Sequence, residues 1–186
     1  MIPVGYMSKK VVSRPDWLKA DKVTDIYSVS GCIAEDFADY INYWKHNGYW
    51  FFDSAEIIES LALAEGIDLG GNTLFYYEVY EQQYAADEKA WQPFEPEQSF
   101  ETQVVEPTSK HLEGYDVVSF HVQTSAECSP LSCNHLAQEM QVNEHCLFNT
   151  FEEAKSHLEN GDFKDCEPGP YRLFAVYTVG NGLTNR

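Results

Sequence analysis

The chain has 186 residues, of which 44% are hydrophobic and 15% aromatic, so its composition is that of a globular protein and not of a disordered acidic chain. Its formal net charge is −18 at pH 7. A body this acidic repels phosphate backbones and anionic lipid surfaces, so we expect no nucleic-acid or membrane binding.

Targeting signals and cysteine usage bear on the compartment. The N-terminus lacks the pattern of a secretory signal, and no apolar run approaches the ~20 residues needed to cross a bilayer. The five cysteines are an odd number at irregular spacing, which argues against a disulfide framework. The expected location is the reducing cytoplasm.

Residues 1–22 hold five of the twelve basic residues and only two of the thirty acidic ones, and we expect them to form an N-terminal arm with Trp17 and Leu18 docked. A first α/β unit is predicted over residues 23–82. Its elements in chain order are a strand at 25–29, a helix with apolar positions 37, 40, 41 and 44, a strand at 49–52, a helix ending near Gly66, and a closing strand at 74–80.

A second unit is predicted over residues 111–180, because a shift of 96 residues superposes Cys32 on Cys128 and Asn47 on Asn143. Its elements are strands at 116–120 and 145–148, an apolar stripe at 133–140, a helix ending near Gly161, and a closing strand at 171–177. Each second helix has capping-box spacing at its start, in Asp53 with Glu56 and in Thr150 with Glu153.

The expected fold is therefore α/β or α+β, with two tandem β-α-β-α-β repeats packed pseudo-symmetrically into one compact domain and the closing strands at its centre. Residues 181–186 form a C-terminal tail. Between the repeats, residues 83–110 are predicted to be an acidic connector that contains prolines and is pinned to the body by aromatic side chains.

Standard catalytic and nucleotide-binding motifs are absent, and no cofactor is expected. Cysteines and histidines between residues 128 and 146 have zinc-ligand chemistry, but Cys133 occupies a predicted core position. Residues 145 and 146 should project to opposite faces of a strand. We therefore predict no metal site.

Cys32 and Cys128 should both lie close to a helix N-terminus, where the helix dipole favours the thiolate form. Such a thiol could serve a cysteine-dependent enzyme. Free cysteine is also among the most frequently buried residue types, and that interpretation predicts an inert structural thiol.

The sequence favours a non-enzymatic binding protein whose acidic surface recognises a basic protein partner, because residues from Val23 onward carry 28 acidic and 7 basic side chains. In size, acidity and absence of motifs the chain resembles bacterial immunity proteins, which neutralise basic toxins; regulatory binding is the other form of this hypothesis. The expected binding residues lie in the connector: Trp91, Phe94, Glu95, Glu97, Glu101 and Glu106. A cysteine-dependent enzyme, or a small-ligand site in a cleft between the repeats, is the alternative.

Overall fold

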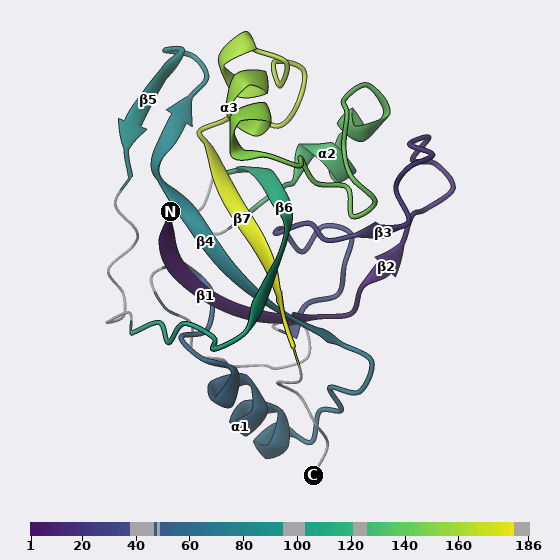
Figure 1. Ribbon diagram of the computed structural model, residues 1–186, viewed down its shortest axis with the longest axis vertical. Helices are drawn as coiled ribbons and strands as arrows, with labels where there is room; N and C mark the ends of the chain where they lie inside the picture. Colours follow the sequence, from purple (N-terminus) through teal and green to yellow (C-terminus); the bar gives the residue numbers. More distant parts are fainter. Residues whose placement is uncertain (38–46, 48, 95–102, 121–125, 181–186) are drawn as a thin grey trace.

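Five strands form the central sheet in the computed structural model, which describes residues 1–37, 47, 49–94, 103–120 and 126–180. The strands lie in the order β1 (Ile2–Lys9), β4 (Thr73–Ala85), β7 (Tyr171–Val179) and β6 (Lys110–Ser119), and β5 (Ala90–Pro93) pairs with the end of β4 (Figure 1). Every pair among them is antiparallel. The fold is mixed α+β.

The two predicted closing strands, now β4 and β7, are the central strands of this sheet, as expected. Residues 171–176 of β7 are all buried, because both faces of the strand are covered. Leu173 belongs to one core cluster and Phe174 to the other. Neighbouring side chains on a strand project to opposite faces, so the sheet separates two hydrophobic cores.

Helices α1 (Ala55–Glu65) and α3 (Phe151–Asn160) lie at opposite ends of the sheet (Figure 1). They end at Gly66 and Gly161, both in the left-handed conformation, as the sequence predicted. α3 has the predicted capping box, whereas α1 begins after Ser54, whose side chain makes no cap hydrogen bond. The Asp53 carboxylate instead accepts hydrogen bonds from the Asn47 side chain and the Gln103 backbone, so the predicted box with Glu56 does not form.

The predicted strands at 49–52 and 145–148 are loops, each with a single bridge to the sheet, from Phe52 to β1 and from Phe148 to β6. A buried or half-buried asparagine side chain organises each loop. Its Oδ1 accepts two backbone N–H groups and its Nδ2 donates to a carbonyl of the neighbouring strand. These asparagines are Asn47 and Asn143, the pair aligned by the repeat.

Each of these loops packs against a glycine of its neighbouring strand. Gly5 in β1 has φ of 126° and Gly114 in β6 has φ of 151°, and each lies at a break in strand register. A Cβ at Gly5 would come within 2.4 Å of the Phe52 carbonyl oxygen, and one at Gly114 within 2.6 Å of the Phe148 carbonyl oxygen. Only glycine fits at either position.

The opening strands differ from the prediction. Residues 1–22, expected as an arm, contribute β1 to the sheet and bury Leu18 completely. The expected strand at 25–29 is reduced to β3 (Asp25–Ile26), which pairs with β2 (Val12–Ser13) in a separate small sheet. The expected strand at 116–120 is the C-terminal part of the longer β6, which ends at Ser119.

The predicted helix with apolar positions 37, 40, 41 and 44 lies outside the described residues except for Phe37. The stripe at 133–140 is split into a short α2 (Pro130–Cys133) and the 3₁₀ helix η2 (Leu136–Gln138). His135 takes a left-handed conformation between them and interrupts the helix. The described residues thus do not follow the predicted β-α-β-α-β order in either half.

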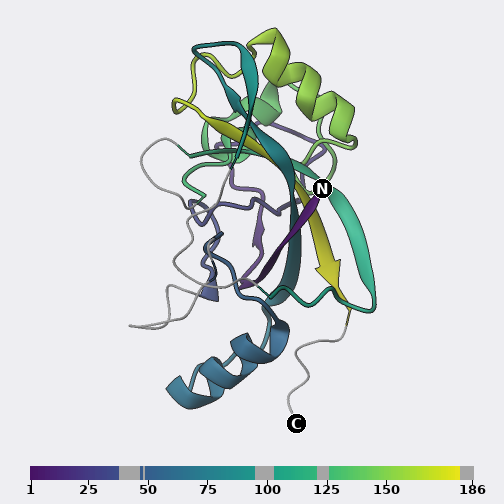
Figure 2. The same ribbon diagram turned by 90° about the vertical axis from the view of Figure 1, so that its left-hand side faces the viewer.

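The two faces of the sheet are covered by different segments (Figure 2). Val29, Phe37 and Phe52 pack with Phe174 on one face. Helix α3 contributes Ala154 and Leu158 to the core on the other face, together with Leu131 of α2. The segment after β3 and the segment before α2 meet beyond the end of β6, where the candidate site lies.

Candidate functional site

Three cysteine side chains converge next to the end of β6. The Sγ atoms of Cys32, Cys128 and Cys133 all lie within 4.8 Å of one another. Cys32 lies in the exposed loop after β3, Cys128 is buried beside Ser119 of β6, and Cys133 is the last residue of α2. Two segments that are distant in sequence therefore supply one thiol cluster.

Reciprocal hydrogen bonds between two serines hold these segments together. The backbone N–H of Ser30 donates to Ser129 Oγ at 3.2 Å, and the backbone N–H of Ser129 donates to Ser30 Oγ at 3.1 Å. The Ser129 hydroxyl in turn donates to Asp116 at 2.6 Å. The loop that carries Cys32 is thus fixed directly against the turn that carries Cys128.

Asp116 and Lys9 are the buried charged residues closest to this junction, exposed by 1% and 2%. Asp116 Oδ2 also accepts the backbone N–H of Val29 at 2.8 Å, whereas Oδ1 has no hydrogen-bond partner among the described residues. Lys9 Nζ donates to three successive carbonyls of the Cys32 loop, those of residues 28, 29 and 30, at 3.0, 2.6 and 3.1 Å. The ammonium therefore places a fixed positive charge beneath the loop.

This environment separates the proton affinities of the thiols. Hydrogen bonds from Cys128 and Cys133 lower the pKa of Cys32 well below its ordinary value, and the charge of Lys9 adds to the effect. The pKa of Cys128 is raised, because hydrogen bonding with the other two thiols and desolvation both favour its protonated form. Burial raises the pKa of Asp116 to about 6. The cluster is arranged to hold negative charge on Cys32.

One contact opposes that charge. Cys32 Sγ lies 2.7 Å from the carbonyl oxygen of Glu127, where a thiol can donate a hydrogen bond and a thiolate cannot. Ionisation of Cys32 therefore requires its sulfur to move away from this carbonyl and toward the other two sulfurs. Oxygen groups border the cluster as well: Asn134 Oδ1 accepts from Cys128 at 3.5 Å, and the Ser30 hydroxyl is 3.9 Å from Cys133 Sγ.

The structure brings together both of the cysteines singled out from the sequence and adds Cys133, which the sequence placed in a core stripe. The other suggested zinc ligands lie elsewhere. His135 packs on Trp17, His145 stacks on Tyr27, and Cys146 is buried with a raised pKa caused by desolvation. Cys128 and Cys133 are five residues apart and could be paired from sequence, whereas the approach of Cys32 depends on tertiary structure.

The predicted connector residues are distributed over several contacts. Trp91 in β5 donates from Nε1 to Glu159 of α3 at 2.8 Å and packs against Tyr80 and Tyr84. Phe94 stacks on Arg172, and Glu106 forms an ion pair with Lys110 at 3.5 Å. Glu95, Glu97 and Glu101 lie outside the described residues. Both aromatic side chains therefore have partners within the chain.

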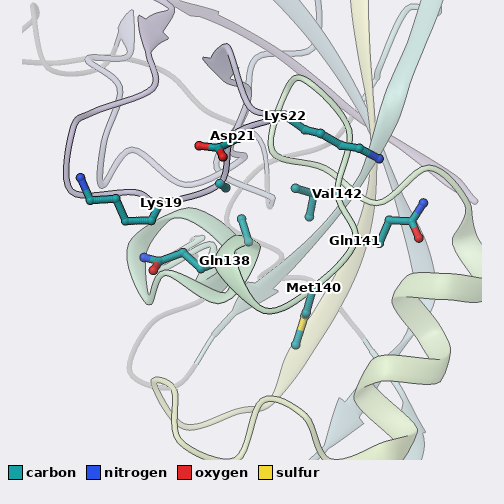
Figure 3. Close-up of a pocket in the computed structure, with 9 residues that line it drawn as sticks. Lys19, Asp21, Lys22, Gln138, Met140, Gln141 and Val142 are labelled. Atoms are coloured by element: carbon teal, nitrogen blue, oxygen red, sulfur yellow. The ribbon is translucent and has the colours of Figure 1, made fainter.

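A surface pocket of about 380 Å³ lies between residues 19–22 and the loop after η2. Lys19, Asp21 and Lys22 are the charged residues of its lining. The ammonium ends of Lys19 and Lys22 point away from each other, as Figure 3 shows, so they do not converge on a common anion. The thiol cluster is the stronger candidate site.

Comparisons with protein-family models, curated proteins and solved structures find no match for this chain. Of the helices in the described part of the chain, none has the length and hydrophobicity to span a membrane. The thiol cluster and the charge of the chain are therefore the features that bear on function.

Proposed function

We propose that this protein binds a thiophilic metal ion, with Zn²⁺ as the first candidate, through Cys32, Cys128 and Cys133. The observation that carries the proposal is the convergence of three Sγ atoms within 4.8 Å of one another. Sulfurs around a tetrahedral zinc lie about 3.8 Å apart, because each Zn–S bond is about 2.3 Å. Side-chain adjustments of less than about 1 Å bring the three thiols to that spacing.

The surrounding charges support this proposal. Thiols bind metals as thiolates, so ligation requires the loss of protons. The pKa of Cys32 is already lowered, by hydrogen bonds from the other two thiols and by Lys9. Three thiolates and one divalent cation have a net charge of −1, and the Lys9 ammonium attracts this charge as well as that of Asp116. Asn134 or a water molecule can serve as the fourth ligand.

A nucleophilic role for Cys32 has less support. A cysteine nucleophile needs a general base or acid close by, and histidine most often fills that role. None of the described histidines belongs to the thiol cluster. A metal ion uses all three sulfurs, whereas a single nucleophile leaves the convergence of Cys128 and Cys133 unexplained.

Cobalt titration tests the proposal. The reduced, chelator-treated chain should bind one equivalent of Co²⁺, with the absorption of a tetrahedral thiolate complex, and Zn²⁺ should displace it with a dissociation constant below about 1 µM. Cys32→Ser, at an exposed position, should weaken binding at least tenfold, whereas Cys166→Ser, outside the cluster, should not. Absence of the thiolate absorption, or equal affinity in Cys32→Ser, would refute the proposal.

A second candidate function is recognition of a basic protein partner, and the net charge of −18 favours it. An acidic surface accelerates the encounter with a cationic partner, and salt weakens the effect. Affinity capture from the native source should retain a basic protein at low salt and release it at high salt. We expect capture to be weaker in a variant with Glu95, Glu97 and Glu101 changed to Gln than in a control variant with Glu59 and Glu65 of α1 changed to Gln. Equal retention of the partner by both variants would contradict a role for the connector.

We also propose that the two halves of the chain are related, in a different register from the sequence alignment. Support comes from the matching environments of Gly5 and Gly114 and from the matching hydrogen bonds of Asn47 and Asn143. The glycines are 109 residues apart and the asparagines 96, so β1 corresponds to β6, and the segment between strand and asparagine loop is longer in the first half.

A further inference from the structure

Arg172 is a buried charged residue in the central sheet. It lies in β7 between Gln83 of β4 and Val118 of β6, and only 1% of its surface is exposed. None of the described carboxylates forms an ion pair with it, and its Nε is buried without a hydrogen-bond partner. Buried charged groups in proteins are normally paired.

Aromatic rings surround the guanidinium instead. Its carbon lies 3.2 Å from the ring centre of Phe94, and the rings of Phe120, Phe174 and Tyr49 follow at 5.3, 5.7 and 5.8 Å. These contacts provide cation–π attraction to the face of the guanidinium. They provide no acceptor for its N–H groups, which project in the plane of the guanidinium.

Two of the four aromatic rings around the Arg172 guanidinium are only partly buried. Phe120 and Phe174 are buried, but Phe94 and Tyr49 are only half-buried, and the ring centres of Phe94 and Tyr49 are 6.5 Å apart. Because these two rings reach the surface, we expect a small molecule to approach the guanidinium past them. A macromolecular surface cannot reach a side chain at this depth.

We propose that Arg172 anchors a binding site for the oxyanion of a small ligand, either a carboxylate or a phosphate. The planar fork of N–H donors in arginine matches two oxygens of such a group, and charge-assisted hydrogen bonds of this kind are strong when desolvated. A bound oxyanion supplies the counter-charge and the acceptors that the aromatic rings cannot. Burial lowers the pKa of Arg172 to about 9, so the guanidinium is still charged at pH 7.

This site is distinct from the thiol cluster. Cys128 forms a bridge with Ser119 of β6, and Ser119 lies opposite Tyr171 of β7. Tyr171 directly precedes Arg172, so their side chains project to opposite faces of the sheet. The proposal therefore does not depend on metal binding, and the two can be tested separately.

The test is thermal unfolding of the full chain with and without saturating inorganic phosphate, phenyl phosphate, acetate or benzoate, each against chloride at equal ionic strength. At least one oxyanion should raise the melting temperature by about 2 °C or more. A phosphate-only or a carboxylate-only response identifies the ligand class. Two variants test the anchor: Arg172→Met removes the charge at similar volume, and Arg172→Lys keeps the charge without the fork.

The stabilisation by the oxyanion should disappear in Arg172→Met. In Arg172→Lys the apparent affinity for the oxyanion should fall at least tenfold, and this variant provides the test if Arg172→Met does not fold. Arg14→Lys is the matched control, because Arg14 bonds a backbone carbonyl at a distant loop. If none of the four anions raises the melting temperature of the wild type, or if the rise is the same in the Arg172→Lys variant, the proposal is wrong.

Discussion

Asp116 is a buried charged residue at the junction between the Cys32 loop and the turn that carries Cys128. Asp116 lies beneath the Ser30–Ser129 contact, where one of its oxygens accepts two hydrogen bonds and the other has no partner in the described part of the chain. Sequence patterns placed residue 116 on a strand but gave no indication that its carboxylate is fully buried, because aspartate is usually exposed. The consequences concern stability and thiol reactivity.

Asp116 should make the fold less stable as the pH rises from 4 to 6. Its pKa is raised from 3.8 to about 6 by burial, so between these values the folded chain binds a proton that the unfolded chain has lost. The contribution is complete below pH 4 and lost above pH 6. Relative to Asp116→Asn, the wild type should lose roughly 3 kcal/mol of unfolding free energy over this range, measured by urea denaturation; a constant difference between the two proteins would contradict the burial argument.

Cys32 should be the reactive thiol of the cluster. It is exposed and its pKa is lowered by hydrogen bonds from Cys128 and Cys133, whereas Cys128 is buried and its pKa is raised. Brief treatment of the native chain with iodoacetamide at pH 6, followed by peptide mass spectrometry, should show modification of Cys32 well ahead of Cys128. Prior addition of Zn²⁺ should protect it. Equal modification of both thiols would show that the cluster does not separate them.

Elements defined by local chemistry were predictable from the sequence, and elements defined by tertiary contacts were not. The central strands β4 and β7 and the glycine ends of α1 and α3 follow from apolar runs and C-cap residues. The loops at 49–52 and 145–148 have the composition of strands, but each asparagine side chain satisfies backbone groups that a strand partner would otherwise bind. β1 was missed because its pairing partner, β4, lies about 70 residues away.

The capping difference between the two long helices has a measurable consequence. Thr150 accepts the backbone N–H of Glu153 and the Glu153 carboxylate accepts that of Thr150, whereas Ser54 makes no cap hydrogen bond. Thr150→Ala should therefore cost about 1 kcal/mol of unfolding free energy. Ser54→Ala should cost less than about 0.5 kcal/mol. Equal losses in chemical denaturation would show that the capping box contributes nothing.

Gly5 and Gly114 should be equally intolerant of a side chain. Alanine at either position has to accommodate both an unfavourable φ and a carbonyl oxygen closer than 3 Å, so each substitution should cost more than about 2 kcal/mol. Gly71→Ala is the control, because φ is also positive there but no atom lies within 4 Å. It should cost about 1 kcal/mol. A small effect at only one of Gly5 and Gly114 would argue against related halves.

At the scale of the whole molecule, the sheet places its two candidate sites in different surroundings. The thiol cluster lies beyond the end of β6, where the loop after β3 meets the turn before α2. Arg172 lies within the sheet beneath aromatic rings. The sequence identified Cys32 and Cys128 individually, but their convergence with Cys133 depends on the Ser30–Ser129 contact between the two halves, which no local pattern encodes.

Native mass spectrometry of the reduced full chain with one equivalent of Zn²⁺ is the decisive test of the thiol cluster as a metal site. We expect a folded species that carries one zinc ion and has lost protons from its thiols. That species should be depleted in Cys32→Ser and in Cys133→Ser but retained in Cys166→Ser. A wild type that remains metal-free, or zinc retained equally in all three variants, would contradict the assignment of the thiol cluster as a metal site.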